Sequence, residues 1–390
     1  MRRRNVAISR GGPWLPFEER AAGYVPRPVD HFRPSRIVLS RGSLNAKTAG
    51  RTEAICRAYP DAEVVDQSDR SHAQIELDAL DPLARHEAGK STLVIGEHKS
   101  AVRFSQEQRN CCPNYWHFSP YGFCPYGCTY CYLAGTRGIW FSPTVKVFLN
   151  LDEMLGRIDD IARQAGLPVG FYLGKLQDGL ALDPLTGYSR RLVPFFAQHR
   201  WARLIVLTKS ADVENLMGLE PRDNVVLSWS LTSKEAWRRF EPGTPSPAQR
   251  LAAIRRCAAG GYRIRVVLMP ILPIPDWPDG YATLLDDLLE SVPVERITLG
   301  SLCSFPNALR LTNAKLGSGN LIQELLTEGG KCRDGRYRFS PQLRTECYRL
   351  LADLIRSHRD DLPVGLCLEE RAVFASSGLS DNIGICNCVL

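Results

Sequence analysis

The chain has 390 residues, of which 44% are hydrophobic and 23% are charged, and these proportions are ordinary for a globular protein with a buried core. They exclude a wholly disordered chain. The net charge of +7 would suit an anionic partner such as nucleic acid, but the Lys and Arg residues are scattered and form no long basic run. The first residues, MRRRNVAISRGGPW, lack the apolar core of a secretory signal, and no apolar stretch is long enough to cross a membrane. We therefore expect a cytoplasmic protein without a membrane segment.

Thirteen cysteines are present. The cytoplasm keeps thiols reduced, and a chain of this length needs no covalent bridges, so the cysteines do not predict a disulfide framework. We expect each of them to be either a buried core side chain or a ligand.

The first third of the chain divides into two predicted parts. Residues 1–35 are rich in Arg, Pro and Gly and have no periodicity, which predicts a flexible arm. Residues 36–104 contain short β-rich runs and a helical run, which predict a small α/β domain. The expected strands are 36–40, 62–66 and 91–98, and the expected helix is Ala46–Tyr59.

Residues 105–370 alternate β-rich runs with amphipathic helices, the pattern of βα units around a parallel sheet. Six such units predict an α/β fold with an open or partial (β/α)6 barrel rather than a closed eight-stranded one. Residues 371–390 then form a tail that contains a Cys-x-Cys pair. The expected barrel strands are Tyr115–Pro120, Val169–Gly174, Leu204–Thr208, Val225–Ser230, Ile264–Met269 and Ile297–Leu302.

Two of the helices have clear boundary signals. Asn150 is expected to cap a helix with one apolar stripe. Ser246, followed by Pro247, is expected to start another helix, which Gly260 and Gly261 end before the next strand. The predicted stripe of the first helix consists of Leu151, Met154, Leu155, Ile158 and Ile161.

The segment FSPYGFCPYGCTYCYLAGT places Cys124, Cys128 and Cys131 in the spacing C-x3-C-x2-C, directly after the first expected barrel strand. Thiolates select iron–sulfur clusters or zinc. Three local ligands would leave one iron of a cubane cluster open, as catalytic zinc sites keep an open position. The alternatives are a structural zinc site completed by a distant cysteine, or three buried thiols without a ligand.

This motif, placed after the first strand of a partial barrel, resembles that of the radical S-adenosylmethionine (AdoMet) superfamily. The segments CTYCYL, TLVIGEHKSAVRF, IVLTKSADVENL, RRFEPGTPSP and AAGGYRIRVVLMPILPIPDWPDGY are similar to those of the spore photoproduct lyase family. The similarity runs from about residue 36 to residue 370. The lysine at position 175, where the lyase has a cysteine, identifies the chain as a divergent member of this family.

The resemblance implies that Cys124, Cys128 and Cys131 bind a [4Fe-4S] cluster whose free iron chelates AdoMet. It also implies a reductant such as flavodoxin or ferredoxin, and one-electron cleavage of AdoMet to a 5′-deoxyadenosyl radical that abstracts hydrogen from the substrate.

Three residues at expected strand ends match family positions that hold AdoMet: Asp178, Lys209 and Ser230. The Lys209 ammonium suits the methionyl carboxylate, Asp178 suits the ribose hydroxyls, and Ser230 can hydrogen-bond either end of the cofactor. The alternatives are a helix cap for Asp178 and a solvated surface charge for Lys209.

Tyr130 and Tyr132 flank the last cysteine of the motif and match tyrosines that, in the lyase, relay a hydrogen atom. The alternative is that both rings shield the cysteine loop from solvent.

Lys175 stands where the lyase has a cysteine that donates hydrogen to the product radical, and a lysine cannot do this. Either the donor has moved, or 5′-deoxyadenosine returns the hydrogen, or the substrate differs. Cys303, at the end of the sixth expected strand, is the leading replacement, and a buried core cysteine is the competing interpretation.

Cys386 and Cys388 lie one residue apart in a tail that we expect to be flexible. They are candidates for redox-active thiols, for ligands of a second metal or cluster with Cys111 and Cys112, or for the missing hydrogen donor. Cys347 lies on a helical apolar stripe and is expected in the core. The cysteines without ligand spacing are left unassigned: Cys56, Cys257, Cys332 and Cys367.

The first functional hypothesis is a radical AdoMet enzyme that repairs or modifies a nucleic-acid base. The alternative is the same chemistry on a peptide or small-molecule substrate, which the Lys175 position and the cysteine-bearing tail favour. A third class, a non-enzymatic zinc- or cluster-binding module, would leave Asp178, Lys209 and Ser230 without a purpose.

Overall fold

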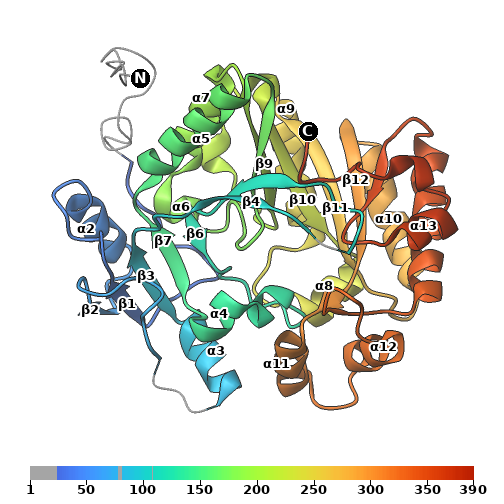
Figure 1. Ribbon diagram of the computed structural model, residues 1–390, viewed down its shortest axis with the longest axis horizontal. Coiled ribbons are helices and arrows are strands. Elements are labelled where there is room, and N and C mark those ends of the chain that lie inside the picture. The colour runs from blue at the N-terminus through green and yellow to red at the C-terminus, as the bar shows by residue number, and fades with distance from the viewer. Residues whose placement is uncertain (1–23, 78–80, 108) are drawn as a thin grey trace, which may run out of the picture.

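The computed structural model describes residues 24–77, 81–107 and 109–390 (Figure 1). Most of the predicted arm, residues 1–35, lies outside these ranges. In its described part, Val29 and Phe32 are buried in the core, and the Phe32 ring packs edge-on against Tyr59 with the centroids 6.1 Å apart.

A five-stranded sheet is formed by β2, β1, β3, β7 and β6, in that order, and lies at the left of Figure 1. β1, β2 and β3 confirm the predicted strands, whereas β6 and β7 were not predicted. β7 escapes detection because Lys146 interrupts its apolar run. The ammonium is nevertheless buried and donates to the carbonyls of Ser142 and Thr144 at 2.8 and 3.0 Å. The bounds are β1 Arg36–Leu39, β2 Glu63–Asp66, β3 Thr92–Gly96, β6 Tyr121–Gly122 and β7 Val145–Phe148.

The second sheet has eight strands in the order β4-β5-β8-β9-β10-β11-β12-β15. The six predicted strands are all present, and each pairs in parallel with its neighbours among them. A parallel strand, β15, and an antiparallel one, β4, extend the two edges. Closure into a partial barrel stays a prediction. The bounds are β4 Val102–Ser105, β5 Tyr115–Phe118, β8 Val169–Leu173, β9 Ala202–Thr208, β10 Val225–Leu231, β11 Arg263–Ile271, β12 Val294–Ser301 and β15 Val364–Leu366.

Helices connect the strands of the large sheet, as the βα pattern predicts. α5 (Leu151–Ala165) buries its predicted stripe, but Asn150 does not cap it with its side chain. The Asn150 amide instead accepts a hydrogen bond from the His98 N–H at 2.9 Å, so this predicted cap is wrong. α9 (Pro247–Ala259) starts with the expected Ser246, which forms a capping box with Gln249.

The remaining helices cover the sheets and their ends. In Figure 1, α10 and α13 lie on the side opposite the five-stranded sheet, and α11 and α12 lie at the bottom. None of the helices within the described ranges is both long and apolar enough to cross a membrane. The bounds are α2 Ala49–Arg57, α3 Pro82–Lys90, α4 Arg137–Phe141, α6 Asp183–Thr186, α7 Ser189–Gln198, α8 Lys234–Phe240, α10 Trp277–Leu289, α11 Pro306–Leu316, α12 Leu321–Gly329, α13 Pro341–His358 and α14 Arg371–Ser376; the small strands are β13 Cys303–Ser304 and β14 Tyr337–Arg338.

The last six residues, 385–390, are fixed against the large sheet, so the prediction of a flexible tail is wrong for them. The guanidinium of Arg265, on β11, donates to the carbonyl of Val389 at 2.6 Å, and that of Arg296, on β12, donates to the carbonyl of Cys386 at 2.7 Å. Gly365, on β15, leaves room for the chain, because a Cβ there would lie 2.0 Å from the Ile385 carbonyl oxygen. The division of the chain into domains stays a prediction.

Candidate active site

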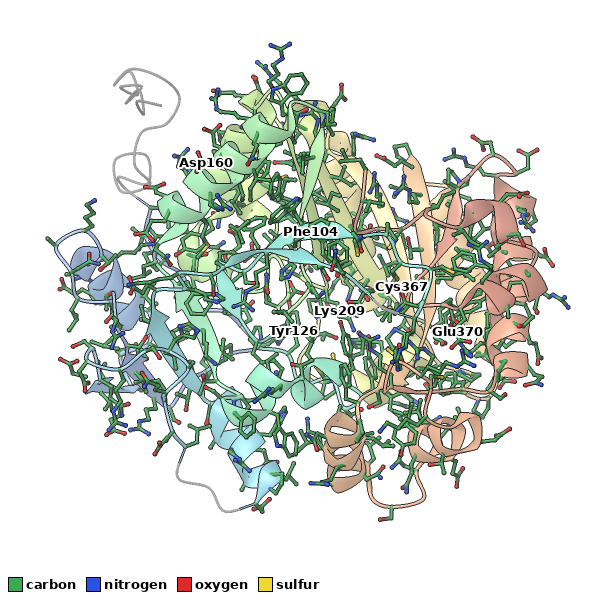
Figure 2. The ribbon with its side chains drawn as sticks, in the orientation of Figure 1. Phe104, Tyr126, Asp160, Lys209, Cys367 and Glu370 are labelled. Carbon is green, nitrogen blue, oxygen red and sulfur yellow. The ribbon has the colours of Figure 1, made fainter. Side chains whose placement is uncertain are left out.

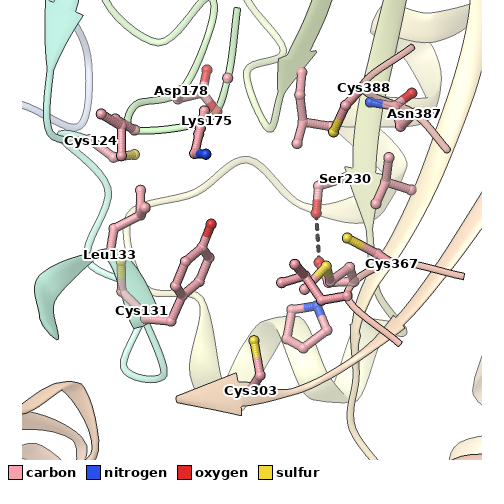
Figure 3. A pocket seen from close by; sticks show the side chains of 18 of the residues that line it. Cys124, Cys131, Leu133, Lys175, Asp178, Ser230, Cys303, Cys367, Asn387 and Cys388 are labelled. Carbon is pink, nitrogen blue, oxygen red and sulfur yellow. Dashed lines mark hydrogen bonds between the residues drawn. The ribbon is translucent and has the colours of Figure 1, made fainter. Parts of the chain in front are cut away.

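A cavity of about 410 Å³ is lined by the ends of the large sheet's strands and by the loops that follow them. Functional groups collect at this edge of parallel βα folds. Figure 3 shows side chains of the cysteine loop, of β10 and of the C-terminal tail around the same space. Every site residue proposed from the sequence lines it: Cys124, Cys128, Tyr130, Cys131, Tyr132, Lys175, Asp178, Lys209, Ser230 and Cys303.

Neighbouring elements hold the cysteine loop through its backbone. The N–H groups of Gly127 and Thr129 donate to the carbonyls of Pro242 and Phe240, at 3.1 and 2.9 Å. The Thr312 hydroxyl, on α11, donates to the carbonyl of Thr129 at 3.0 Å. Because Phe240 and Pro242 belong to the RRFEPGTPSP segment, that segment supports the loop directly.

Lys90, the last residue of α3, binds the cysteine loop from the side of the five-stranded sheet. Its ammonium donates to the carbonyl of Cys124, and to that of Tyr126 at 2.7 Å. It also lies 3.8 Å from the centroid of the Phe123 ring, a cation–π distance. Both sheets therefore contribute to the position of the cysteines.

The donor set fits an iron–sulfur centre. Cys124, Cys128 and Cys131 face one cavity from one loop, and a cluster bonds each thiolate through a different iron. Within the described ranges, no three His, Cys, Asp or Glu side chains lie together in the way that a single metal ion requires. The Lys209 ammonium lies 3.9 Å from the Cys128 sulfur, which places a positive charge beside a prospective thiolate.

Lys209 belongs to a buried ionic network centred on Glu241. The carboxylate of Glu241 accepts hydrogen bonds from the Lys209 ammonium at 2.5 Å, from the Tyr130 hydroxyl and from the Arg250 guanidinium. Arg250 also donates to the Ser230 carbonyl at 2.9 Å. The network thus links the cysteine loop with the ends of β9 and β10. Lys209, which Figure 2 labels near the middle of the view, is therefore not a solvated surface charge.

The charges of this network are mutually stabilising. Burial alone would raise the pKa of Glu241, but Lys209 and Arg250 outweigh it and hold that pKa at about 2. Burial acts against the charge on Lys209, yet Cys128 and Glu241 raise its pKa above the ordinary value. Lys209 therefore carries its positive charge into the cavity at neutral pH.

Asp178 lines the cavity but already has several partners. One carboxylate oxygen accepts from the Thr208 hydroxyl at 2.6 Å and from the N–H groups of Leu180 and Ala181; the other accepts from the N–H of Lys209 at 2.7 Å. These contacts join the loop after β8 to the end of β9. The role of Asp178 toward a ribose stays a prediction.

Ser230, on β10, donates its hydroxyl hydrogen to the carbonyl of Met269 at 2.8 Å (Figure 3). Lys175 lies across the cavity and pairs with Glu107, with the ammonium 3.3 Å from the carboxylate. Glu107 also pairs with Arg336 at 3.1 Å, and Arg336 pairs in addition with Asp334 at 2.8 Å.

Cys303, on β13, is buried against the floor of the cavity and shown below Lys175 in Figure 3. Burial raises the pKa of its thiol to about 11, so the sulfur carries a proton at neutral pH. Tyr132 also lines the cavity, and its pKa is raised by burial and by the nearby Cys303 thiol. Cys347 is buried in the main core, as predicted.

The structure also brings together thiols that sequence spacing did not connect. Cys112, Cys367, Cys386 and Cys388 line the same cavity, whereas Cys111 is not among its lining residues. Sequence reasoning also missed Glu241 and Arg336. Glu241 could have been found from the sequence, because it lies in the family-like segment RRFEPGTPSP. No sequence pattern points to Arg336 or Cys367, because only tertiary packing brings them to the cavity.

A family model described as spore photoproduct lyase matches residues 32–301, which is more than half of the chain. The chain belongs to the spore photoproduct lyase family. This is a radical AdoMet family, and the chain is a divergent member. It is 30% identical over 234 residues to the spore photoproduct lyase of Geobacillus sp. (strain Y412MC61), an alignment that covers 58% of this chain and 67% of the relative. It is 26% identical over 226 residues to that of Bacillus subtilis (strain 168), covering 57% and 64% respectively.

Solved structures of spore photoproduct lyase share the mixed α/β fold. One in complex with dinucleoside spore photoproduct matches with a TM-score of 0.74 and 22% identity, over 86% of this chain and 99% of that chain. A variant with bound AdoMet and dinucleoside spore photoproduct matches with a TM-score of 0.72 over the same shares. The α/β fold class predicted from the sequence is thereby confirmed.

Proposed function

We propose that this member of the spore photoproduct lyase family binds a [4Fe-4S] cluster and AdoMet in the cavity and uses them to abstract hydrogen from a substrate held there. The observation that carries the proposal is convergence: the three motif cysteines and three polar side chains from strand ends line one cavity. A binding module would need only the cysteines. The polar residues are Asp178, Lys209 and Ser230.

When bound, the cluster and AdoMet supply a 5′-deoxyadenosyl radical. In the proposal, Cys124, Cys128 and Cys131 bind the cluster. The Lys209 ammonium pairs with the methionyl carboxylate, for which the Glu241 network keeps it charged and oriented. Ser230, on the neighbouring strand, hydrogen-bonds the cofactor.

We propose a nucleic-acid base lesion as the substrate class, since solved relatives bind dinucleoside spore photoproduct. A second candidate is a peptide or small molecule with an anionic group. Lys175 and Arg336 favour it, because they place two cations in the cavity wall, where both pair with Glu107 and Arg336 also pairs with Asp334.

Cys303 is our proposed hydrogen donor to the product radical. Its thiol is protonated at neutral pH and lines the cavity beside Tyr132. Tyr130 is held by Glu241 and Lys209, which suits a positioning role, and Tyr132 is the tyrosine with access to Cys303 for a hydrogen-atom relay.

Anaerobic reconstitution tests the cluster. The protein should bind about four iron and four sulfide per chain and show the absorption of a [4Fe-4S] centre, and Cys128→Ala should abolish this. The matched control is Cys257→Ala, which removes a buried thiol of α9 that does not line the cavity. Retention of the full cluster by Cys128→Ala would overturn the assignment.

Reductive cleavage of AdoMet, with and without an oligonucleotide that contains spore photoproduct, tests the substrate class. A base-lesion enzyme should form 5′-deoxyadenosine faster with the lesion and restore the thymines. No stimulation by the lesion favours the second candidate. In D2O, product from the wild type should contain solvent deuterium, and Cys303→Ala should lose it if Cys303 is the donor.

A further inference from the structure

Three segments that are far apart in the sequence bring four thiols to the lining of the cavity. Cys112 precedes β5, Cys367 follows β15, and Cys386 and Cys388 come from the C-terminal tail. Figure 3 shows the Cys367 and Cys388 sulfurs on the side of the cavity opposite Cys124. All thirteen cysteines of the chain are free thiols in this structure.

Backbone contacts hold these segments side by side. The Cys111 N–H donates to the Glu369 carbonyl at 2.8 Å, and the Leu368 N–H donates to the Cys112 sulfur at 3.2 Å. Arg296 holds the tail by donating to the Cys386 carbonyl at 2.7 Å. The thiols therefore lie in fixed backbone positions.

Among these four thiols, the Cys386 sulfur accepts hydrogen bonds from its neighbours. Hydrogen bonds from the thiols of Cys112 and then Cys388 lower its pKa, with a smaller contribution from Arg296. The pKa of Cys112 is raised, first by its contact with Cys367 and then by that with Cys386. The thiols of Cys112 and Cys386 are thus in contact although they come from different segments, and the contact lowers the pKa of one and raises that of the other, as in reactive dithiols.

We propose that Cys112 and Cys386 are a redox-active dithiol site that reacts with small disulfides entering the cavity and closes to an intramolecular disulfide. The site lies outside the cysteine loop and does not depend on the proposed radical chemistry. Closing it would bond the tail covalently to the segment before β5 and remove two thiols from the cavity wall.

The exchange proceeds in two steps. The Cys386 thiolate attacks one sulfur of the small disulfide, forming a mixed disulfide and releasing one small thiolate. That thiolate takes the proton of Cys112, and the resulting Cys112 thiolate attacks the Cys386 sulfur. The second small thiolate leaves, so one disulfide is reduced to a thiol and a thiolate while one forms in the protein. A dithiol reductant reverses both steps.

Cys386 is only 2% exposed, and the cavity is its route to solvent, so the test uses a small probe. The reconstituted protein is treated anaerobically with 2-hydroxyethyl disulfide, blocked with N-ethylmaleimide and mapped as non-reduced peptides. We expect a Cys112–Cys386 cross-linked peptide that dithiothreitol removes. A predominant Cys386–Cys388 link, or no reaction of Cys386 while the half-buried Cys56 of α2 is modified, would overturn the proposal.

Variants identify the attacking sulfur. Cys112→Ser should trap the hydroxyethyl mixed disulfide on Cys386, whereas Cys386→Ser should leave Cys112 unmodified. Cys388→Ser and Cys367→Ser are the matched controls, because each removes a neighbouring thiol and should keep the cross-link. Should a variant fail to fold, the wild-type peptide map still decides between the pairings. Loss of the cross-link in Cys388→Ser would assign the site to the tail pair instead.

Discussion

At the scale of single residues, Glu241 organises the polar part of the cavity. It is 1% exposed and shared by Lys209, Arg250 and the hydroxyl of Tyr130. Removing one partner from a buried ion pair leaves the other charge without compensation, which is far more costly than losing a surface pair. Glu241 does not itself line the cavity, yet together with Cys128 it raises the pKa of Lys209 and so favours the charge that Lys209 presents there.

Glu241→Gln should lower the free energy of unfolding by about 3 kcal/mol at pH 7, as measured in urea. The pKa of Glu241, at about 2, lies below its ordinary value of 4.5. Its contribution is therefore fully present above pH 4.5 and is lost as the pH falls toward 2. The difference between the wild type and the variant should shrink over that range.

The control for this prediction is Glu235→Gln, on the neighbouring helix α8. Glu235 forms an exposed pair with Arg238, so its loss should change the free energy of unfolding by less than about 1 kcal/mol. Equal effects of the two substitutions would show that the Glu241 network contributes no more than a surface pair.

At the scale of elements, the cysteine loop is held by its neighbours α3 and α11 and by the RRFEPGTPSP segment. The loop continues into the short 3₁₀ helix Tyr132–Gly135, which packs closely against α11. A Cβ at Gly135 would lie 2.5 Å from the backbone nitrogen of Ala308. Only glycine permits this approach, because a backbone atom cannot move aside as a flexible side chain can.

Gly135→Ala should therefore push α11 away from the cysteine loop, lower the free energy of unfolding by about 1–3 kcal/mol and reduce the iron retained after reconstitution. Gly138→Ala is the matched control, since no atom lies within 4 Å of a Cβ at that position in α4. That substitution should be neutral or stabilise by about 0.5–1 kcal/mol. Normal melting temperature and iron content in Gly135→Ala would contradict the prediction.

At the scale of the whole molecule, both ends of the described chain pack against the body of the protein. Residues 24–35 pack through Val29 and Phe32 into the main core, and residues 385–390 close one wall of the cavity. Arg265, 1% exposed on β11, bonds the tail through the Val389 carbonyl. The tail is thus part of the site.

Deleting residues 385–390 should lower the free energy of unfolding by about 1–3 kcal/mol, because the buried Arg265 loses its carbonyl partner. The Cys112 and Cys367 thiols should also react faster with N-ethylmaleimide. In an Arg265→Met background the same deletion should be less costly, since no guanidinium is left without that partner. Equal losses in both backgrounds would show that Arg265 does not hold the tail.

Much of this arrangement was predictable from local patterns. The six central strands, the buried stripe of α5 and the capping box at Ser246 follow from periodicity and capping chemistry, which depend on neighbours in the chain. The predicted cap at Asn150 is wrong because its side chain accepts a hydrogen bond from the backbone N–H of His98, 52 residues earlier. β7 was missed because a buried lysine hides its apolar pattern.

The sequence by itself determined the family, the α/β alternation and the three motif cysteines, since each can be recognised from residues that lie close together along the chain. Only the tertiary structure decided that Glu241 holds Lys209, that Lys175 and Arg336 share Glu107, and that Cys112 and Cys367 meet the tail. The physical reason is distance along the chain. Burial, charge compensation and thiol contacts act between side chains that only folding brings together, and no local spacing records them.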